Sequence, residues 1–331
     1  MICSVTFQCV GGIALAAILS ACGGADADRP PSPRPRIEIP AGAQTFKVAT
    51  WNIRSGMGIR GFSTTSWSHE TLNCTDRSQP MNAWGMGLPQ AQLERIKSDP
   101  TIIALALQEA WNCGAPQNVN EVLGFKTASR ARNGTALLAR HGVSGPVTYH
   151  EIDARANQWL IGGDVCLEAG CANTMPIYSV HFADTTEDGV PIQAQRVLEF
   201  LARRGGARIF MGDLNVHKTD TWNPKVRCTA RDKPGALRTI GMIEGAGYTD
   251  AWKATQNSEG WTGMASRRRC GSPAGNLYKR IDYVYSSGLQ TVSTDRFGRA
   301  APGGDAPSDH VGLIAELLIV PAGAAPGEPA P

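Results

Sequence analysis

The chain has 331 residues, of which 42% are hydrophobic and 18% charged, and it contains 37 glycines and 21 prolines. This composition is typical of a loop-rich globular protein, and it excludes a coiled coil, a collagen and a wholly disordered chain. Lysine and arginine number 32 against 29 aspartates and glutamates, an excess too small to demand or exclude a nucleic-acid partner. No apolar run reaches the roughly 18 residues of a membrane-spanning helix, so we expect no integral membrane segment.

Residues 1–21 are predicted to be a targeting segment. Residues 10–21 form an apolar run that suits a signal-peptide core but is too short to span a bilayer. The sequence Leu-Ser-Ala before Cys22 resembles a bacterial lipobox, so we expect a lipidated Cys22 and an exported membrane lipoprotein that faces the periplasm or the cell exterior. The alternative is an ordinary signal peptide with a chance cysteine, and residues 1–9 lack the positive charge usual at such a start.

The rest of the chain divides into three predicted parts. Residues 22–41 are rich in proline and glycine and predict an extended tether, and residues 321–331 predict a disordered tail. Residues 42–320 have the length of one large domain, and no second proline-rich linker divides them. We therefore expect a monomer that contacts the membrane only through its N-terminal lipid anchor.

Six of the nine cysteines fall within this domain, and an even number in an exported domain favours disulfides. The safest pair is Cys166 with Cys171, which would close a short loop. Cys74 with Cys113 and Cys228 with Cys270 then follow only by elimination and order. A zinc site is disfavoured because paired C-x-x-C spacing is missing.

Hydrophobic patterns predict strands and helices in alternation along the domain. The predicted strands cover 46–54, 101–108, 135–139, 147–152, 175–182, 208–211, 280–285 and 311–320, and the predicted helices cover 90–99, 191–204 and 234–244. In the second helix we expect Ile192, Val197, Leu198 and Leu201 on the buried face. Many strands with few helices indicate the α/β class with a mixed sheet.

Polar residues punctuate the ends of these strands. They are Asn52, Glu109, His181, Asp213, Asn215, Asp282, Asp309 and His310. Ligands of α/β sheets gather at the carboxyl ends of strands, and several acids that converge there would repel one another without a cation. Carboxylate and amide oxygens are ligands suited to Mg²⁺ or Ca²⁺ rather than Zn²⁺.

Six short blocks occur in one order along the chain: WNIR, LQEA, SVHF, GDLN, RIDYVY and SDH. Together they resemble the endonuclease/exonuclease/phosphatase superfamily, which includes deoxyribonuclease I, abasic-site endonucleases, sphingomyelinases and inositol-polyphosphate phosphatases. The resemblance covers residues 46–320. It implies a four-layer α/β sandwich in which two packed mixed β-sheets are flanked by helices, as in deoxyribonuclease I.

The resemblance also implies metal and water roles. Glu109 would be the principal ligand of Mg²⁺, for which Mn²⁺ and Ca²⁺ are alternatives, with Asn52 and Asp309 beside it. Asp213 would orient or deprotonate the attacking water, and Asn215 would hold a phosphate oxygen. Such a cation and a fixed carboxylate supply what phosphodiester hydrolysis needs.

Two histidines complete the implied machinery. His310 would be the catalytic histidine, hydrogen-bonded by Asp282, which would raise its pKa. His181 would be the second catalytic histidine, which the abasic-site branch lacks. Deoxyribonuclease I has a glutamate that hydrogen-bonds this second histidine, whereas residues 130–141 contain no acid here.

Three further residues are candidate substrate contacts. Arg54 matches an arginine that contacts substrate in deoxyribonuclease I, and its alternative is a plain surface arginine. Asn133 resembles part of a family block and would bind phosphate. Tyr178 lies where the abasic-site branch has a functional tyrosine, although a strand tyrosine is more often core.

The resulting hypothesis is an exported, lipid-anchored, divalent-metal-dependent phosphodiesterase, with nucleic acid (DNA or RNA) as the leading substrate. The alternatives are a sphingomyelinase acting on phospholipid, an inositol-phosphate phosphatase, and a binding protein without catalysis. A basic region is formed by residues 267–269 with Lys279 and Arg280, and it would grip phosphates or form a solvated loop. Residues 56–61 match G-x-G-x-x-G, but no helical pattern follows, which disfavours a nicotinamide site.

Overall fold

The computed structural model describes residues 37, 39–40, 42–54, 87–111, 115–183, 189–217, 234–256, 260–264, 277–298 and 308–319. They belong to one compact unit, Pro33–Pro331. Cys22, Cys74, Cys113, Cys228 and Cys270 lie outside the described residues, as do segments 1–21 and 321–331, so the predictions made for them stay predictions. Among the described helices, none is long and apolar enough to cross a membrane.

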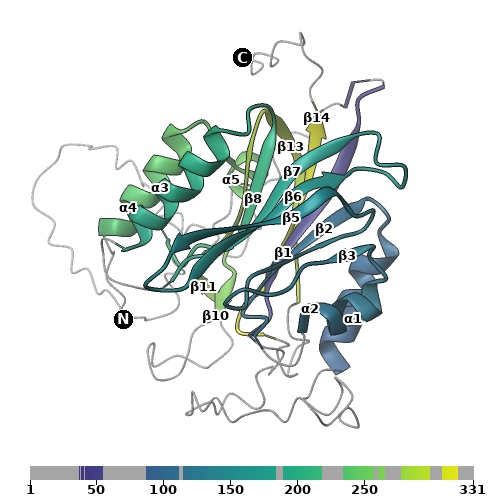
Figure 1. Ribbon diagram of the computed structural model, residues 1–331, viewed down its shortest axis with the longest axis horizontal. Coiled ribbons are helices and arrows are strands. Elements are labelled where there is room, and N and C mark those ends of the chain that lie inside the picture. Colours follow the sequence, from purple (N-terminus) through teal and green to yellow (C-terminus); the bar gives the residue numbers. More distant parts are fainter. Residues whose placement is uncertain are drawn as a thin grey trace, which may run out of the picture. The chain divides into compact units, whose positions relative to one another are not determined.

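Two six-stranded sheets form the centre of the fold (Figure 1). The first has the order β13-β14-β1-β2-β4-β3, with β1 (Thr45–Asn52), β2 (Ile102–Gln108), β3 (Thr127–Ala128), β4 (Ala136–Ala139), β13 (Leu289–Phe297) and β14 (Gly312–Ile319). The second has the order β5-β6-β7-β8-β12-β9, with β5 (Val143–Asp153), β6 (Gln158–Cys166), β7 (Thr174–His181), β8 (Arg208–Asp213), β9 (Thr249–Asp250) and β12 (Asp282–Ser287). β1 pairs with β2 and β7 with β8 in parallel, while the other pairs are antiparallel, so both sheets are mixed.

Helices cover the outer faces of the two sheets. In Figure 1, α1 (Gly87–Ser98) and α2 (Ala115–Leu123) lie on one side, and α3 (Gly189–Ala202) and α4 (Pro234–Gly245) on the other. A short helix, α5 (Ala251–Thr255), and a separate ribbon of β10 (Gly263–Met264) and β11 (Leu277–Lys279) complete the fold. The four-layer α/β sandwich expected from the resemblance is therefore confirmed.

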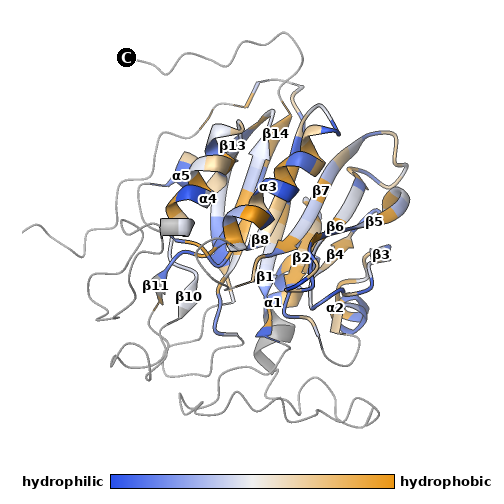
Figure 2. Cartoon of the chain, turned by 60° about the vertical axis from the view of Figure 1, so that its left-hand side comes forward, coloured by the Kyte–Doolittle hydropathy of each residue, from blue (hydrophilic) through white to orange (hydrophobic). Residues whose placement is uncertain are grey.

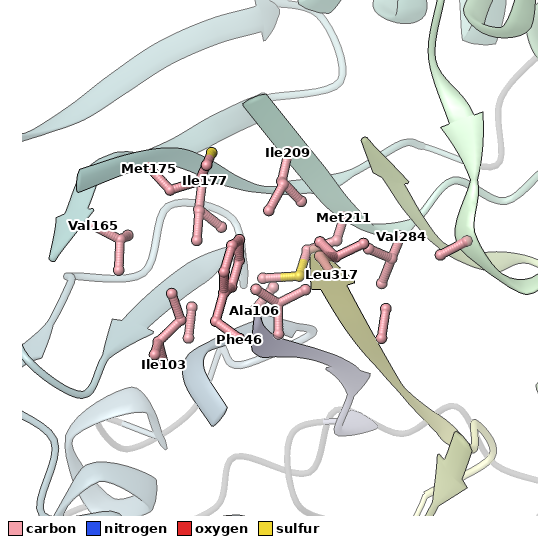
Figure 3. Close-up of a cluster of buried hydrophobic side chains, with 14 of the residues drawn as sticks. Phe46, Ile103, Ala106, Val165, Met175, Ile177, Ile209, Met211, Val284 and Leu317 are labelled. Atoms are coloured by element: carbon pink, nitrogen blue, oxygen red, sulfur yellow. The ribbon is translucent and has the colours of Figure 1, made fainter. Parts of the chain in front are cut away.

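The main core lies between the two sheets. Figure 3 shows Phe46 and Ile103 of the first sheet pointing toward Met175, Ile177 and Ile209 of the second. Each of these side chains is at most 4% exposed. Burial of one large apolar side chain stabilises the fold by about 1.5–3 kcal/mol. This layer therefore holds together the two sheets that carry the polar strand ends.

The helix α3 shows where the predicted helical pattern was wrong. Ile192 is 47% exposed, whereas Val190, Ala194, Val197 and Leu201 face the second sheet. The buried spacing of four, three and four residues follows the helical period, and Ile192 falls outside it. Figure 2 shows both apolar and polar residues along this helix, as expected for one that packs with a single face.

The sequence patterns missed two long strands, β6 and β13. Glycines at 162 and 163 interrupt β6 and are typical of a loop. A Cβ at Gly162 would lie 2.1 Å from the carbonyl oxygen of Ile177, so β6 requires glycine in order to approach β7. β13 is an edge strand that buries only part of one face, which weakens its hydrophobic signal.

The loop that follows β6 carries a disulfide. Cys166 and Cys171 are bonded, with their Cα atoms 4.6 Å apart, and this pairing is confirmed.

Candidate active site

Strand pairing brings the polar ends of four parallel-paired strands together at one end of the sandwich. Asn52 ends β1 and lies beside Gln108 of β2, which directly precedes Glu109. His181 ends β7 and pairs with Asp213, the last residue of β8. In both sheets the apolar part of the strand is buried, so the polar residue at its end is the first that can face a ligand.

Asp282 and His310 reach the same end from antiparallel strands. Asp282 begins β12 and pairs with Asp213, because β12 runs opposite to β8. His310 precedes β14, which runs opposite to β1. As expected, Asp282 and His310 lie near the site. They stand at the beginnings of strands, whereas the sequence pattern placed the polar residues at the carboxyl ends of strands.

The carboxylate of Asp213 lies at the centre of the site and is 1% exposed. Its Oδ1 accepts the backbone N–H of Asn215 at 2.8 Å, and its Oδ2 accepts the side-chain amide of Asn52 at 3.0 Å. The same Oδ2 lies 3.6 Å from Nε2 of His181 and 3.7 Å from Nε2 of His310. One carboxylate oxygen therefore stands between two imidazoles.

His310 is held by a carboxylate of its own. Its Nδ1 lies 2.9 Å from Oδ2 of Asp282. Burial lowers the pKa of His310, but the negative charges of Asp282 and Asp213 outweigh burial and hold that pKa well above its usual range. The two carboxylates therefore favour the protonated imidazole, in which Nδ1–H is directed at Asp282 and Nε2–H toward Asp213.

Backbone contacts fix this pair in place. The Oγ of Ser308 donates to the carbonyl oxygen of Asn52 at 2.7 Å and accepts the N–H of His310 at 3.1 Å. The Oγ1 of Thr262 accepts the N–H of Asp282 at 3.2 Å. Sequence reasoning missed both hydroxyls; Ser308 stands within the SDH block, so a signal for it was present, whereas nothing marked Thr262.

His181 has different neighbours. The amide nitrogen of Asn215 lies 3.3 Å from Nε2 of His181 and donates to the carbonyl oxygen of Phe182 at 2.8 Å. Because this amide is a donor, Nε2 of His181 acts as the acceptor and Nδ1 carries the proton. Among the described residues, Nδ1 of His181 has no hydrogen-bond partner. This agrees with the lack of an acid in residues 130–141.

Negative charge accumulates on the other side of Asp213. The Oε1 of Glu109 accepts the amide of Asn52 at 3.0 Å. Burial, and then the negative charge of Asp309, raises the pKa of Glu109. Ligand atoms of Glu109, His181 and Asp213 lie within 4.8 Å of one another, as do those of Asp213, Asp282 and His310. The first group, with Asp309 nearby, suits a hard divalent cation.

A match to a protein-family model identifies the family of this chain. Residues 49–310 match the model of the Endonuclease/Exonuclease/phosphatase family. The chain belongs to the endonuclease/exonuclease/phosphatase family. Members of this family are phosphoric ester hydrolases that generally depend on a metal ion.

Solved structures agree with this family fold at low identity. An endonuclease/exonuclease/phosphatase from Bacteroides vulgatus shows 14% identity and a TM-score of 0.54, covering 84% of this chain and 100% of that one. TDP2 from Caenorhabditis elegans shows 16% identity and a TM-score of 0.52, covering 83% of this chain and 74% of that one. The mannosyl-6-phosphatase Bt3783 from Bacteroides thetaiotaomicron shows 14% identity and a TM-score of 0.52, covering 82% of this chain and 99% of that one. A search of curated proteins gave no significant match.

Several residues of this endonuclease/exonuclease/phosphatase site adopt a left-handed backbone. Arg54, Glu109, Asn133 and Asn215 have φ angles of 45°, 51°, 44° and 51°. Residues other than glycine rarely adopt these angles, and such outliers cluster at functional sites. All four were singled out from the sequence as site residues.

The metal ligands expected from the family resemblance are only partly in ligand positions. Glu109 and Asp309 lie close together, but the Oδ1 of Asn52 accepts the N–H of Arg54 at 3.0 Å. Asn52 therefore bridges the carboxylates of Glu109 and Asp213 through its amide nitrogen, and its role as a metal ligand stays a prediction.

The three candidate substrate contacts have different outcomes. Arg54 lies at the site, with Nε 3.8 Å from Oδ2 of Asp309. Asn133 uses its side chain within the protein, accepting from Nε1 of Trp111 at 3.2 Å and donating to the carbonyl oxygen of Ala156 at 3.4 Å. This structure therefore does not show the expected open phosphate contact.

The prediction for Tyr178 is wrong. Its side chain is 0% exposed and packs in the core between the second sheet and α3 and α4. Burial raises its pKa to about 12, so it stays a neutral phenol. Tyr178 is three residues before His181, and because side chains alternate along a strand the two point to opposite faces of β7.

Proposed function

We propose that the protein is a divalent-metal-dependent phosphodiesterase that hydrolyses nucleic acid. The observation that carries this proposal is the position of Asp213, with one carboxylate oxygen between the imidazoles of His181 and His310 and next to the acidic group of Glu109. A water held by this carboxylate would lose its proton there as it attacks phosphorus. A cationic imidazole beside it would stabilise the charge that develops on the phosphate oxygens.

His310 supplies that cation in our proposal. The Asp282 carboxylate fixes the ring and keeps it protonated, so Nε2–H can bind a phosphate oxygen or give its proton to the leaving oxygen. Asn215, whose amide already faces His181, would orient a second phosphate oxygen.

The residues present fit a metal ion. Ligand atoms of Glu109 and Asp213 lie within 4.8 Å of each other, and burial, followed by the negative charge of Asp309, raises the pKa of Glu109. Glu109 and Asp309 would supply carboxylate oxygens to hold Mg²⁺, or Mn²⁺ or Ca²⁺ in its place. A bound divalent ion would polarise the phosphate and offset this repulsion.

The test is plasmid nicking by the full-length chain, exported to an oxidising compartment and purified in detergent. We expect nicking of supercoiled DNA with Mg²⁺ that EDTA and Glu109→Gln abolish. Glu199→Gln, the same substitution on the exposed face of α3, is the matched control and should cut normally. If folded wild-type protein cleaves neither supercoiled plasmid nor single-stranded DNA, that result would contradict a DNA endonuclease. Assays with single-stranded RNA and with mannose 6-phosphate would then separate an RNA substrate from a phosphomonoester.

We further propose that the enzyme is exported and anchored through lipidated Cys22, as a monomer. The support is the lipobox-like sequence and the following proline-rich segment. Mass spectrometry of the purified chain should find a lipid on Cys22, and Cys22→Ser should move the protein from the membrane to the soluble fraction. An unmodified Cys22, or an unchanged membrane fraction in the variant, would contradict the anchor.

A further inference from the structure

An exposed tryptophan stands beside the proposed metal site. Trp111 follows Glu109 by two residues and is 40% exposed. Its Nε1 donates to Oδ1 of Asn133 at 3.2 Å, and Asn133 is anchored in turn on the carbonyl oxygen of Ala156. The indole is therefore held in one orientation although it stands at the surface.

Because Gly134 has no side chain, the ring of Trp111 can pack closely against the backbone at Gly134 and Glu109. A Cβ at Gly134 would lie 2.5 Å from Nε1 of Trp111 and 2.9 Å from Cα of Glu109. The carbonyl oxygen of Gly134 also accepts the N–H of Ala110 at 2.9 Å. The ring and the carboxylate thus belong to one rigid unit, and rigid aromatic rings bind ligands at a low cost in entropy.

The cationic side chain of Arg132 lies over two more aromatic rings, those of Tyr149 on β5 and Trp159 on β6. The guanidinium of Arg132 is 5.8 Å from the ring centroid of Tyr149 and 5.7 Å from that of Trp159. Arg132 is exposed, and Tyr149 is 37% exposed. The N–H of Arg130 donates to the hydroxyl of Tyr149 at 3.1 Å, which fixes that ring as well. Arg132 is thereby positioned while its charge remains open to an anion.

Strand pairing places both features on the same side of the site. Leu160 of β6 pairs with Val180 of β7, so Trp159 stands one residue further along, next to the strand end that carries His181. Trp111 stands beside Glu109 on the other sheet. Trp111 therefore lies beside Glu109, and Trp159 lies opposite His181 in the strand register. In the second sheet β5 and β6 form the side that carries Tyr149 and Trp159 (Figure 1).

The nearby acids leave this surface able to bind phosphate. Glu151 pairs with Trp159 across the hairpin and is exposed. Asp153 accepts the backbone N–H of Arg155 at 3.0 Å and the side-chain amide of Gln193 at 2.9 Å, so its carboxylate is bound within the protein. Arg132 is exposed and, within the described part of the chain, forms no ion pair with either acid, so its charge is accessible beside the two rings.

We propose that Trp111, Arg132 and Trp159 form a subsite for the nucleotide next to the scissile phosphate, with a base stacked on Trp111 and the neighbouring phosphate on Arg132. This proposal rests on the phosphodiesterase function proposed above. A small phosphomonoester has one phosphate, which the metal site would hold, and offers nothing to a second cation. A stacked ring requires a base outside a duplex, so the substrate class is single-stranded or locally unpaired nucleic acid.

The test compares two substrates: a single-stranded oligothymidylate and the small diester bis(4-nitrophenyl) phosphate. For Trp111→Ala, the ratio of kcat/KM on the oligonucleotide to kcat/KM on the small diester should fall about tenfold, as expected for the loss of one stacked base. Trp111→Phe keeps a ring but loses the bond to Asn133, and its ratio should lie between those of wild type and the alanine variant. Ile192→Ala, an exposed apolar residue on α3, should leave the ratio unchanged.

A binding assay gives a readout without turnover. Anisotropy of a fluorescein-labelled oligothymidylate in EDTA should show about tenfold weaker binding by Trp111→Ala. Arg132→Gln should weaken binding and reduce its dependence on salt, because one phosphate contact is lost. If Trp111→Ala is poorly folded by circular dichroism, Arg132→Gln carries the test.

The outcomes separate the two proposals. If wild type hydrolyses both diesters but neither the ratio nor the binding changes in the variants, the subsite is overturned and the phosphodiesterase stands. If wild type hydrolyses neither diester but does release phosphate from a phosphomonoester, both proposals fail.

Discussion

The two imidazoles of the site are the same chemical group at the same distance from one carboxylate, and they differ in what stands behind them. His310 and His181 lie 3.7 Å and 3.6 Å from Oδ2 of Asp213. Behind His310 stands Asp282, whereas the described residues offer no partner to Nδ1 of His181, and Asn215 approaches its Nε2. The partner on the far nitrogen, more than proximity to Asp213, therefore divides the roles: Asp282 favours the protonated, donating form of His310, whereas Nε2 of His181 accepts from the amide of Asn215.

The largest expected effect tests the cationic side. His310→Ala should lower kcat/KM on bis(4-nitrophenyl) phosphate by about 10²–10⁴-fold, the usual contribution of a positioned acid–base group. Circular dichroism checks that the variant is folded, because His310 is buried and its removal takes a partner from the buried carboxylate of Asp282. A variant that keeps more than about a tenth of the rate would remove His310 from the mechanism.

The acceptor side should matter less. His181→Ala should lower kcat/KM by about 10²-fold, at the lower end of that range, because no second carboxylate binds its Nδ1 among the described residues as Asp282 binds Nδ1 of His310. Steady-state kinetics of both single variants under one set of conditions makes the comparison. An equal or larger loss for His181→Ala would reverse the assignment of roles.

The charge of Asp282 should set a pH dependence. The pKa of His310 is raised in the folded state, so its protonation stabilises the fold. This stabilisation is fully present below the unfolded pKa of about 6.5, and it is lost as the pH rises through the folded pKa. Asp282→Asn removes the supporting charge, so the alkaline limb of the rate profile should move to lower pH. Rate profiles and NMR titration of His310 measure this, and an unshifted alkaline limb would contradict the pairing.

The smallest effect on the site should come from the disulfide, which lies on the loop after β6. Cys171→Ser should lower the free energy of unfolding by about 2 kcal/mol, from the entropy of closing so short a loop. The ratio of rates between the two histidine variants should not change, since the bond is remote from both. Urea denaturation and the same kinetic assay measure the two effects. A shift in that ratio would indicate that the two imidazoles depend on distant packing.

Much of the site could be predicted because strand ends are marked locally. Glu109 follows a continuous apolar run, and Asp213 and Asn215 follow another, so the change from apolar to polar marks the point where the strand leaves the core. The six ordered blocks then predicted the family and its four layers, which the structure and the family match confirm. The strand β6 was not predicted because its two glycines are typical of loops, although Gly162 is needed there for close packing on β7.

Local pattern could not determine which face a strand residue would present or which partner it would find. Tyr178 appeared to be a substrate contact from its spacing to His181, but strand alternation and the packing of α3 place it in the core. Asn133 was expected to bind phosphate, and instead it orients Trp111, which no sequence signal marked as more than a surface ring.

By itself, the sequence determined the family, the strands that carry the chemistry and the chemical types of the site residues, because burial of apolar runs and the placing of polar groups at their ends are local properties. Only the tertiary structure decided that Ser308 ties His310 to the end of β1 and that Thr262 holds Asp282. It also decided that Trp111 lies beside Glu109 at Gly134 and that Arg132 lies over the rings of Tyr149 and Trp159. These contacts join residues far apart in the chain, and they depend on strand register and the packing of two sheets, which no short stretch of sequence encodes.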